Sequence, residues 1–277
     1  MLIVSTLEEL HSARLLLDGP TGFVPTMGYL HEGHVSLARR AKEECKSVIV
    51  SIFVNPTQFG PSEDLSKYPR NLERDLSLLE AAGVSLVWTP TPEVMYPPGF
   101  ATWVEVEGLT KPLEGAARPG HFRGVTTVVA KLFNAVRPQR AYFGQKDAQQ
   151  AAVIRKMTRD LNFPIEVIVC PTVREADGLA MSSRNSYLSP EERQAATILF
   201  RALTAAKAAY ERGERDAESL RQVMAATLAS EPRAQMQYVS VADYDTLEEL
   251  QTVTGKTLLS MAVYLGKTRL IDNFVLG

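Results

Sequence analysis

The sequence predicts an α/β protein: a Rossmann-like, doubly wound parallel sheet followed by a smaller α+β C-terminal domain. Three observations support this prediction. Strand-like and helix-like segments alternate through the first 170 residues, which is typical of a parallel sheet with helices on both faces. The run Val48–Val54 is almost wholly apolar, as a strand covered on both sides should be. From about Val173 the alternation gives way to a polar loop and a different pattern.

Residues 1–172 form the first predicted domain. Short apolar runs bounded by turn-forming or polar residues predict its strands, and apolar residues spaced three or four apart predict its helices. The predicted strands are Phe23–Thr26, Ser47–Val54, Ser85–Thr89, Arg140–Phe143 and Ile165–Cys170. The predicted helices are His34–Cys45, Asn71–Ala82, Val125–Arg137 and Asp147–Leu161.

Residues 173–277 form the second predicted domain. Ser189 followed by Pro190 and two acids is a strong helix start, because it combines an N-cap, a first-turn proline and favourable charge. One helix is expected from there to Arg212 and another over Asp216–Ala229. Strands are expected over Gln237–Ala242, Leu258–Leu265 and Thr268–Asn273, with Gly266-Lys267 turning the last two into a hairpin.

Composition narrows the class of protein. The 277-residue chain carries 30 basic and 32 acidic residues, a net charge of −2, so no global basic surface points to nucleic acid or an anionic membrane. Its two cysteines lie far apart, which disfavours a disulfide framework or a Cys-rich zinc site. The sequence shows no signal-peptide pattern and no apolar run long enough to span a membrane, so we expect a cytoplasmic protein.

The most informative motif is His31-Glu-Gly-His34, which lies where a predicted strand passes into a helix. Open α/β sheets bind ligands at such places, and a helix N-terminus attracts phosphate. Three interpretations compete: local packing of the rings, a metal site, and phosphate binding. The spacing Gly28-x-x-x-x-Gly33 matches a P-loop, but His34 replaces its lysine and no Ser/Thr follows.

Two further motifs follow the same logic. Asn55 and Gln58 come after the second predicted strand; they either satisfy the loop backbone or bind the hydroxyl and carboxylate groups of a small substrate. Arg118 and His121 precede a helix, and they belong either to an ordinary surface loop or to one that recruits an anion.

The remaining polar motifs follow the last two predicted strands. Lys146 suits phosphate oxygens, whereas Asp147 could either cap a helix or hold a ribose hydroxyl. Gln150 lies one turn further on, and the loop containing Ser182-Ser-Arg184 suits a polyphosphate. Because the carboxyl ends of strands converge in a doubly wound sheet, these motifs are expected to form one site.

Together the motifs resemble the pantothenate synthetase (pantoate–β-alanine ligase) family, within the His-x-Gly-His nucleotidyltransferase superfamily that also includes class I aminoacyl-tRNA synthetases. The resemblance covers most of the chain and departs only around Glu73-Arg-Asp75, where the family often has more acids. The motifs that carry it are Pro25-Thr-Met-Gly-x-Leu-His-Glu-Gly-His34, Phe53-Val-Asn-Pro-Thr-Gln-Phe59, Tyr68-Pro-Arg70, Arg118-Pro-Gly-His-Phe122, Phe143-Gly-Gln-Lys-Asp147 and Glu175-Ala-Asp-Gly-Leu-Ala-Met-Ser-Ser-Arg-Asn185.

The resemblance implies ATP-dependent condensation of pantoate with β-alanine through a pantoyl adenylate, in a homodimer that uses Mg²⁺ and no tightly bound organic cofactor. Residues 1–172 would bind nucleotide and pantoate, and residues 173–277 would act as a lid. The implied catalytic residues are His31, His34, Lys146 and Arg184. The implied ATP-binding residues are Met27, His34, Gly144, Lys146, Asp147, Val173, Met181, Ser182, Ser183 and Arg184. Pantoate and β-alanine would contact Met27, Asn55, Gln58, Arg118 and Gln150, and Asp75 would bind Mg²⁺.

Two other function classes stay open on the residues alone. A metallohydrolase could use His31, His34 and His121 as zinc ligands, but it would leave Lys146 and the Ser-Ser-Arg loop without a role. A nucleotide-binding module without catalysis would explain the fold but not the convergence of polar side chains. A tRNA-charging role is disfavoured because no anticodon-binding extension or basic surface is evident.

Overall fold

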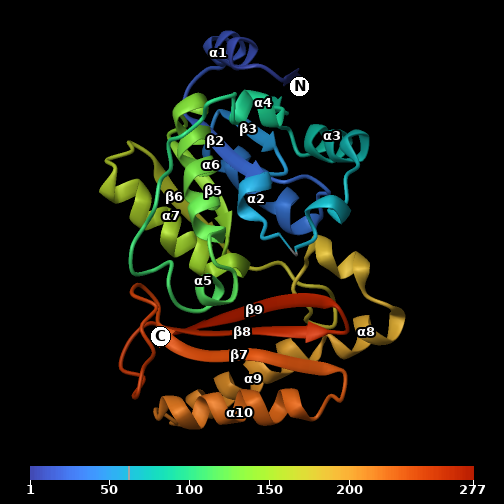
Figure 1. The fold of residues 1–277 in the computed structure, drawn as a ribbon, viewed down its shortest axis with the longest axis vertical. Coiled ribbons are helices and arrows are strands. Elements are labelled where there is room, and N and C mark those ends of the chain that lie inside the picture. Colours follow the sequence, from blue (N-terminus) through green and yellow to red (C-terminus); the bar gives the residue numbers. More distant parts are fainter. Residues whose placement is uncertain (62) are drawn as a thin grey trace. The chain divides into compact units, whose positions relative to one another are not determined.

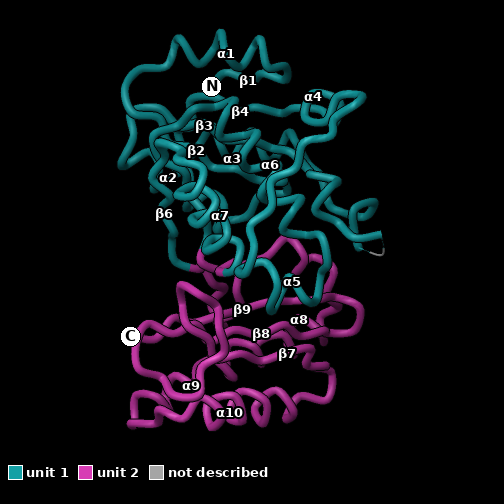
Figure 2. The backbone as a smooth tube through the Cα atoms, turned by 60° about the vertical axis from the view of Figure 1, so that its left-hand side comes forward, with its two compact units in different colours: residues 1–144, 149–171 teal, residues 145–148, 172–277 magenta. Residues whose placement is uncertain are grey.

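The structure is a computed structural model that describes residues 1–61 and 63–277. The chain divides into two compact units (Figure 2). Unit 1 comprises Met1–Gly144 and Gln149–Pro171, and unit 2 comprises Gln145–Ala148 and Thr172–Gly277. Within residues 1–61 and 63–277, every helix is too short or too polar to span a lipid bilayer.

Unit 1 is built on a six-stranded, all-parallel sheet in the order β1-β4-β3-β2-β5-β6. Figure 1 labels β2, β3, β5 and β6 of this sheet. The strand order reverses between β2 and β5, and ligands bind outside the carboxyl ends of strands at such a switch point. The strands are β1 (Leu2–Val4), β2 (Thr21–Thr26), β3 (Ser47–Ile52), β4 (Leu86–Trp88), β5 (Arg140–Gly144) and β6 (Glu166–Cys170).

Helices cover both faces of this sheet, as the alternating pattern predicted. Successive strand residues point to opposite faces. Phe23 and Ile49 pack into one apolar cluster with α1, α6 and α7, whereas Val24 and Val50 pack into another with α2 and α3. The helices are α1 (Leu7–Leu15), α2 (Glu32–Glu44), α3 (Leu72–Ala81), α4 (Pro92–Met95), α5 (Glu114–Ala117), α6 (His121–Val136) and α7 (Ala148–Asp160). Short 3-10 turns η1 (Pro56–Gln58), η2 (Leu65–Lys67) and η3 (Gln145–Asp147) lie between them.

Unit 2 contains a three-stranded antiparallel sheet in the order β7-β8-β9, with α9 and α10 packed on it. The predicted hairpin is confirmed, because Leu265 pairs with Thr268 across the two-residue turn Gly266-Lys267. The elements are η4 (Ser183–Tyr187), α8 (Pro190–Ala195), α9 (Ile198–Glu211), α10 (Ala217–Ala229), β7 (Ala234–Asp243), β8 (Thr257–Leu265) and β9 (Thr268–Leu276).

The structure corrects the sequence prediction at several places, which include the unpredicted short helices α4 and α5. The prediction missed β1 and α1, although Thr6 and Glu9 form a capping box at the start of α1. Helix α6 begins at His121, four residues before the predicted start. The single helix expected from Ser189 to Arg212 is two helices, because the Thr197 N–H and hydroxyl both donate to the Gln194 carbonyl and interrupt the helical ladder.

Candidate active site

The loop after β2 is fixed by a buried carboxylate. Asp75 of α3 is 1% exposed, and its two oxygens accept the backbone N–H groups of Tyr29 and Leu30, each at 2.7 Å. The loop needs this support because Gly28 and Tyr29 both have left-handed φ values, 80° and 50°. These contacts engage both oxygens of Asp75 inside the protein, so the metal-binding role predicted for Asp75 gains no support from the structure.

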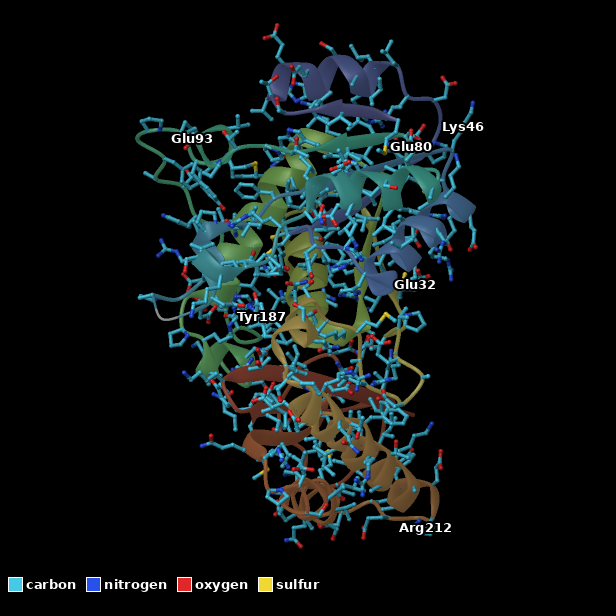
Figure 3. All side chains as sticks on the ribbon, turned by 90° about the vertical axis from the view of Figure 1, so that its right-hand side faces the viewer. Glu32, Lys46, Glu80, Glu93, Tyr187 and Arg212 are labelled. Atoms are coloured by element: carbon cyan, nitrogen blue, oxygen red, sulfur yellow. The ribbon has the colours of Figure 1, made fainter. Side chains whose placement is uncertain are left out.

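The two motif histidines lie at the N-terminus of α2, which begins at Glu32 (labelled in Figure 3). Their ring centroids are 4.1 Å apart. His31 Nδ1 accepts the Gly33 N–H at 3.2 Å, and His34 Nδ1 accepts the His31 N–H at 3.4 Å. With Nδ1 used as an acceptor, each neutral ring carries its proton on Nε2. The loop therefore presents two imidazole donors at a helix N-terminus, where anions bind favourably.

Met27, Asn55 and Gln58 form a second group in unit 1. Asn55 is 1% exposed and donates to Gln58 Oε1 at 3.1 Å and to the Gly124 carbonyl at 3.2 Å. Its own oxygen accepts the hydroxyl of Tyr96 at 2.8 Å. The Gln58 amide nitrogen in turn lies 3.1 Å from the sulfur of Met27. The amide group of Asn55 therefore uses its hydrogen bonds within the protein, and one of them orients Gln58. Gln58 and Met27 themselves remain partly exposed.

Arg118 and His121 belong to a tightly bonded cluster. Arg118 forms two hydrogen bonds to Glu63, at 2.7 and 2.8 Å, and donates to His121 Nε2 at 3.1 Å. His121 Nδ1 donates to the Gln58 carbonyl at 2.8 Å. Burial, and then the Arg118 charge, lowers the pKa of His121 from its usual value to about 4. Both side chains thus brace the segment around Gln58 rather than forming an exposed anion-recruiting loop.

The neighbouring glutamines of α7 differ in their surroundings. Gln149 is buried, accepts the Glu114 N–H at 2.9 Å, and donates to the carbonyls of Leu109 and Pro112. Gln150 is half-buried, and its side chain makes no hydrogen bond to the described part of the chain. Of the two, Gln150 retains the hydrogen-bonding capacity that a substrate would use.

In unit 2, the turn that follows β5 carries Lys146 and Asp147. Lys146 Nζ lies 3.9 Å from the Asp147 carboxylate, and its side chain is 20% exposed. Asp147 makes no capping hydrogen bond to α7 among residues 1–61 and 63–277, so the capping role considered for it is not seen. The turn leaves a cation and a half-exposed carboxylate close together directly after Gly144.

The loop around Ser182-Ser-Arg184 is folded back on itself. The Met181 N–H donates to the Val173 carbonyl at 3.0 Å, and Arg174 and Ala180 form an antiparallel bridge. Ser182 caps η4 by accepting the Arg184 N–H at 3.3 Å. The turn runs on to Tyr187, which is labelled in Figure 3.

The sequence did not predict several residues whose hydrogen bonds hold the candidate site residues in position. Glu63, Arg174, Asp272 and Asn273 all bond to the predicted motifs or to segments next to them. No local pattern marks them, because each acts on a segment that is distant in sequence. No cluster of three or more His, Cys, Asp or Glu side chains able to hold a metal occurs in the described chain. The zinc site of the metallohydrolase alternative therefore lacks a ligand set there.

The chain is similar to known proteins over its whole length. A family model described as pantoate-beta-alanine ligase matches residues 2–275. The pantothenate synthetase of Roseiflexus sp. (strain RS-1) is 63% identical over 276 residues, which cover 100% of this chain and 99% of the relative. The pantothenate synthetase of Herpetosiphon aurantiacus is 61% identical over 277 residues, covering 100% of both chains.

Solved structures agree with these relatives. The pantothenate synthetase of Thermus thermophilus matches with a TM-score of 0.95 at 51% identity and covers 99% of both chains. A pantoate-beta-alanine ligase from Francisella tularensis, solved with "Beta-gamma ATP" and β-alanine, matches with a TM-score of 0.81 at 37% identity. That match covers 99% of this chain and 97% of the other.

Proposed function

The chain belongs to the pantoate–β-alanine ligase family, and from that premise we propose how its own residues carry out the reaction. The enzyme uses ATP to join pantoate to β-alanine through an amide bond, giving pantothenate. We propose two steps. The pantoate carboxylate attacks the α-phosphorus of ATP, the bond to the β-phosphate breaks, and pyrophosphate leaves. The β-alanine amine then attacks the acyl carbon, expelling AMP and losing a proton.

Adenylation makes the second step possible because a free carboxylate is a poor electrophile. The proposed route needs no covalent enzyme intermediate, so it asks the protein chiefly to position the reactants and to stabilise charge.

The observation that carries this proposal is that the imidazole rings of His31 and His34 lie side by side at the N-terminus of α2. Both Nδ1 atoms accept backbone hydrogen bonds at the start of α2, which makes Nε2 the protonated nitrogen of each neutral ring. Two such donors stabilise the negative charge that builds on the phosphate oxygens as pyrophosphate leaves. Their fixed geometry means that little reorganisation is needed during the step.

Pantoate is assigned to the group around Gln58. We propose that Gln58 and Gln150 hydrogen-bond the hydroxyl and carboxylate groups, while Met27 contacts the methyl groups. The hydrogen-bonding groups of the Asn55 side chain are already used within the protein, and Arg118 is ion-paired with Glu63. We therefore assign Asn55 and Arg118 a supporting role. They keep the Gln58 segment in place, and Asn55 does so by a direct bond to the Gln58 side chain.

The triphosphate is assigned to the cations and hydroxyls of unit 2. We propose that Lys146, Ser182, Ser183 and Arg184 bind phosphate oxygens and that Asp147 binds the ribose. Gly144, Val173 and Met181 would line the nucleotide through their backbone and apolar atoms. Positive charge and hydroxyl donors are the chemistry that a triphosphate requires.

We propose that Mg²⁺ arrives with ATP, as part of the nucleotide substrate. Magnesium usually keeps several waters and bonds to substrate phosphates rather than to a protein cage. The Asp75 carboxylate is buried and each of its oxygens already accepts a backbone N–H, so it does not fit the role of a Mg²⁺ ligand. We further propose a cytoplasmic homodimer, as the resemblance implies; light scattering of the purified protein tests the assembly.

The reaction itself is tested by product analysis. The purified chain is incubated with ATP, Mg²⁺, pantoate and β-alanine, and each component is omitted in turn. We expect pantothenate only in the complete mixture, where it forms together with AMP and pyrophosphate. Without β-alanine we expect the first step alone, seen as ATP–pyrophosphate exchange that requires pantoate and Mg²⁺. Exchange that strictly needs β-alanine would contradict the free adenylate.

Residue roles are tested by matched substitutions. His34→Ala should slow adenylation by about 10²-fold, on the scale of a lost oxyanion donor, whereas His11→Ala on the exposed face of α1 should not. Gln58→Ala and Gln150→Ala should raise the KM for pantoate and leave the KM for ATP nearly unchanged, with the exposed Gln222→Ala as control. An equal rise in the KM values for pantoate and ATP would instead assign the two glutamines to the nucleotide site.

A further inference from the structure

Two neighbouring residues of β9 bond to both of the unit 2 segments to which the proposed function assigns the triphosphate. Asn273 contacts the turn Gln145–Asp147, and Asp272 contacts Arg174 at the start of the loop that leads to Arg184. These two segments are separated by more than 20 residues of sequence, most of which belong to unit 1. All of the contacts described here lie within unit 2.

Asn273 fixes the backbone of the lysine turn. Its side chain is almost fully buried, at 4% exposure, and its amide nitrogen donates to the carbonyls of Gln145 at 3.0 Å and Lys146 at 2.8 Å. Its oxygen accepts the Gln145 amide at 3.0 Å, and Tyr244 donates to the other end of that amide at 3.2 Å. The hydrogen bond to the Lys146 carbonyl directly restrains the backbone of Lys146, whose side chain is proposed to bind phosphate.

Asp272 fixes the second segment by charge. Arg174 donates to both of its oxygens, at 2.7 and 2.9 Å, and also to the Gly178 carbonyl at 3.0 Å. The Arg174 guanidinium lies 5.0 Å from the ring centroids of Phe200 and of Phe274. A bidentate pair of this kind holds geometry as well as charge.

The two anchors are themselves coupled. The backbone N–H of Asn273 donates to Asp272 Oδ1 at 2.8 Å, so the same carboxylate that holds Arg174 also orients the strand at Asn273. The two segments are therefore joined by hydrogen bonds through two adjacent strand residues.

We propose that Asp272 and Asn273 are positioning residues that set Lys146 and the Ser182–Arg184 segment at a fixed spacing, so that both bind one triphosphate. The proposal rests on the proposed phosphate-binding role of these segments. It assigns to the last strand of the fold a function in adenylation that does not involve contact with the substrate. Preorganisation of this kind acts on the reaction that uses all three phosphates.

The test uses Asn273→Asp in the full-length enzyme. This change keeps the size of the side chain but replaces both donated hydrogen bonds by a carboxylate oxygen facing two carbonyls. The matched control is Ser260→Ala. Ser260 pairs with Asn273 across the β8–β9 ladder and is buried at 7% exposure, but its hydroxyl has no hydrogen-bond partner among the described residues.

We expect Asn273→Asp to lower kcat/KM for ATP in ATP–pyrophosphate exchange by about 10-fold or more, the scale of misplaced catalytic groups. The KM for pantoate should stay within about twofold, since pantoate is assigned to unit 1. The attack of β-alanine on preformed pantoyl adenylate should be affected less, because the adenylate keeps only one phosphate and, of the contacts assigned to this turn, chiefly the one from Asp147 to the ribose. Ser260→Ala should match the wild type in each assay.

Unchanged ATP kinetics in a folded Asn273→Asp protein would overturn the proposal, as would an equal loss in both half-reactions. If Asn273→Asp does not fold, Arg174→Lys decides: it keeps the charge but loses the bidentate geometry, and it should show the same selective loss for ATP. Lys146→Ala separates the two proposals. If it leaves exchange intact, the proposed phosphate role fails; if it abolishes exchange while Asn273→Asp and Arg174→Lys do not, only the positioning role fails.

Discussion

At the scale of single residues, the carboxylate of Asp75 shows how a polar side chain predicted to bind a ligand can instead hold the backbone of the site in place. Its two oxygens hold the N–H groups of Tyr29 and Leu30, just before His31. An unsatisfied buried donor costs about 1–3 kcal/mol. The position of the histidine pair therefore depends on a residue that is itself almost completely shielded from solvent.

Asp75→Asn tests this role against metal binding. We expect the variant to lower both the melting temperature without nucleotide and the adenylation rate, because an amide nitrogen then faces a backbone N–H. Excess Mg²⁺ should not restore the rate. The exposed Glu73→Gln in the same helix turn should have little effect on either quantity. Full recovery at high Mg²⁺ with unchanged thermal stability would instead identify a metal ligand.

The buried imidazole of His121 makes stability depend on pH. Its pKa lies at about 4 in the folded chain and near 6.5 when unfolded. Between these values the unfolded chain binds a proton that the folded chain excludes, so the free energy of unfolding rises with pH over this window. It should therefore fall as the pH is lowered from about 6.5 to 4, by on the order of 3 kcal/mol from this group.

Urea unfolding of the wild type and of His121→Asn at several pH values between 4 and 7 measures this contribution. Asn keeps a donor for the Gln58 carbonyl but does not titrate. The Arg118–Glu63 pair stays in both proteins, so the difference between the two curves isolates His121. Parallel curves would show that the folded chain accommodates the charged ring.

At the scale of elements, α6 and η1 form a single support for the proposed pantoate group. A side chain at Gly124 would place its Cβ 2.3 Å from the Thr57 carbonyl oxygen, so the helix lies directly against the backbone of η1. The Gly124 carbonyl also accepts the Asn55 amide. The helix thus fixes both the path of η1 and the amide that orients Gln58.

Gly124→Ala should displace η1 and with it Gln58. We expect the KM for pantoate to rise by roughly 10-fold, the KM for ATP to change little, and the melting temperature to fall, since overpacking costs about 1–3 kcal/mol. Gly255→Ala is the matched control, because no described heavy atom lies within 4 Å of its added Cβ. A normal KM for pantoate in a stable Gly124→Ala protein would argue that η1 does not hold this substrate.

At the scale of the whole molecule, the residues that we propose to bind ATP are divided between the two units of the chain. His31 and His34 belong to unit 1, whereas Lys146 and Arg184 belong to unit 2. We propose that unit 2 acts as a lid when ATP binds. Excluding water in this way protects the adenylate from hydrolysis.

Limited trypsin digestion measures this closure. ATP with Mg²⁺ should slow cleavage after Arg184, because the residue then binds phosphate and its loop is ordered. Cleavage after the exposed Arg212, labelled in Figure 3 at the end of α9, serves as the internal reference and should not change. Cleavage at Arg184 that is indifferent to nucleotide would argue against both phosphate binding and the lid.

The sequence by itself predicted the fold class and the motifs, because both are written in local patterns. Alternating apolar periodicity is enough to indicate a parallel sheet flanked by helices. The histidine motif, the lysine turn and the Ser-Ser-Arg loop are contiguous in the sequence, so their chemistry and their resemblance to a family are readable before folding. Two features that were missed or misjudged depend on local hydrogen bonds that an apolar periodicity does not contain: the capping box of α1 and the two bonds from Thr197 to the Gln194 carbonyl.

Only the tertiary structure decided which polar residues are already used by the protein. Asp75, Asn55 and Arg118 look like ligands in the sequence, but each directs its hydrogen bonds to a distant backbone or side chain. Asn273 has no motif at all, yet it bonds to Lys146 across 127 residues. The physical reason is that hydrogen bonds are satisfied by neighbours in space, and the folding of distant segments onto one another sets those neighbours.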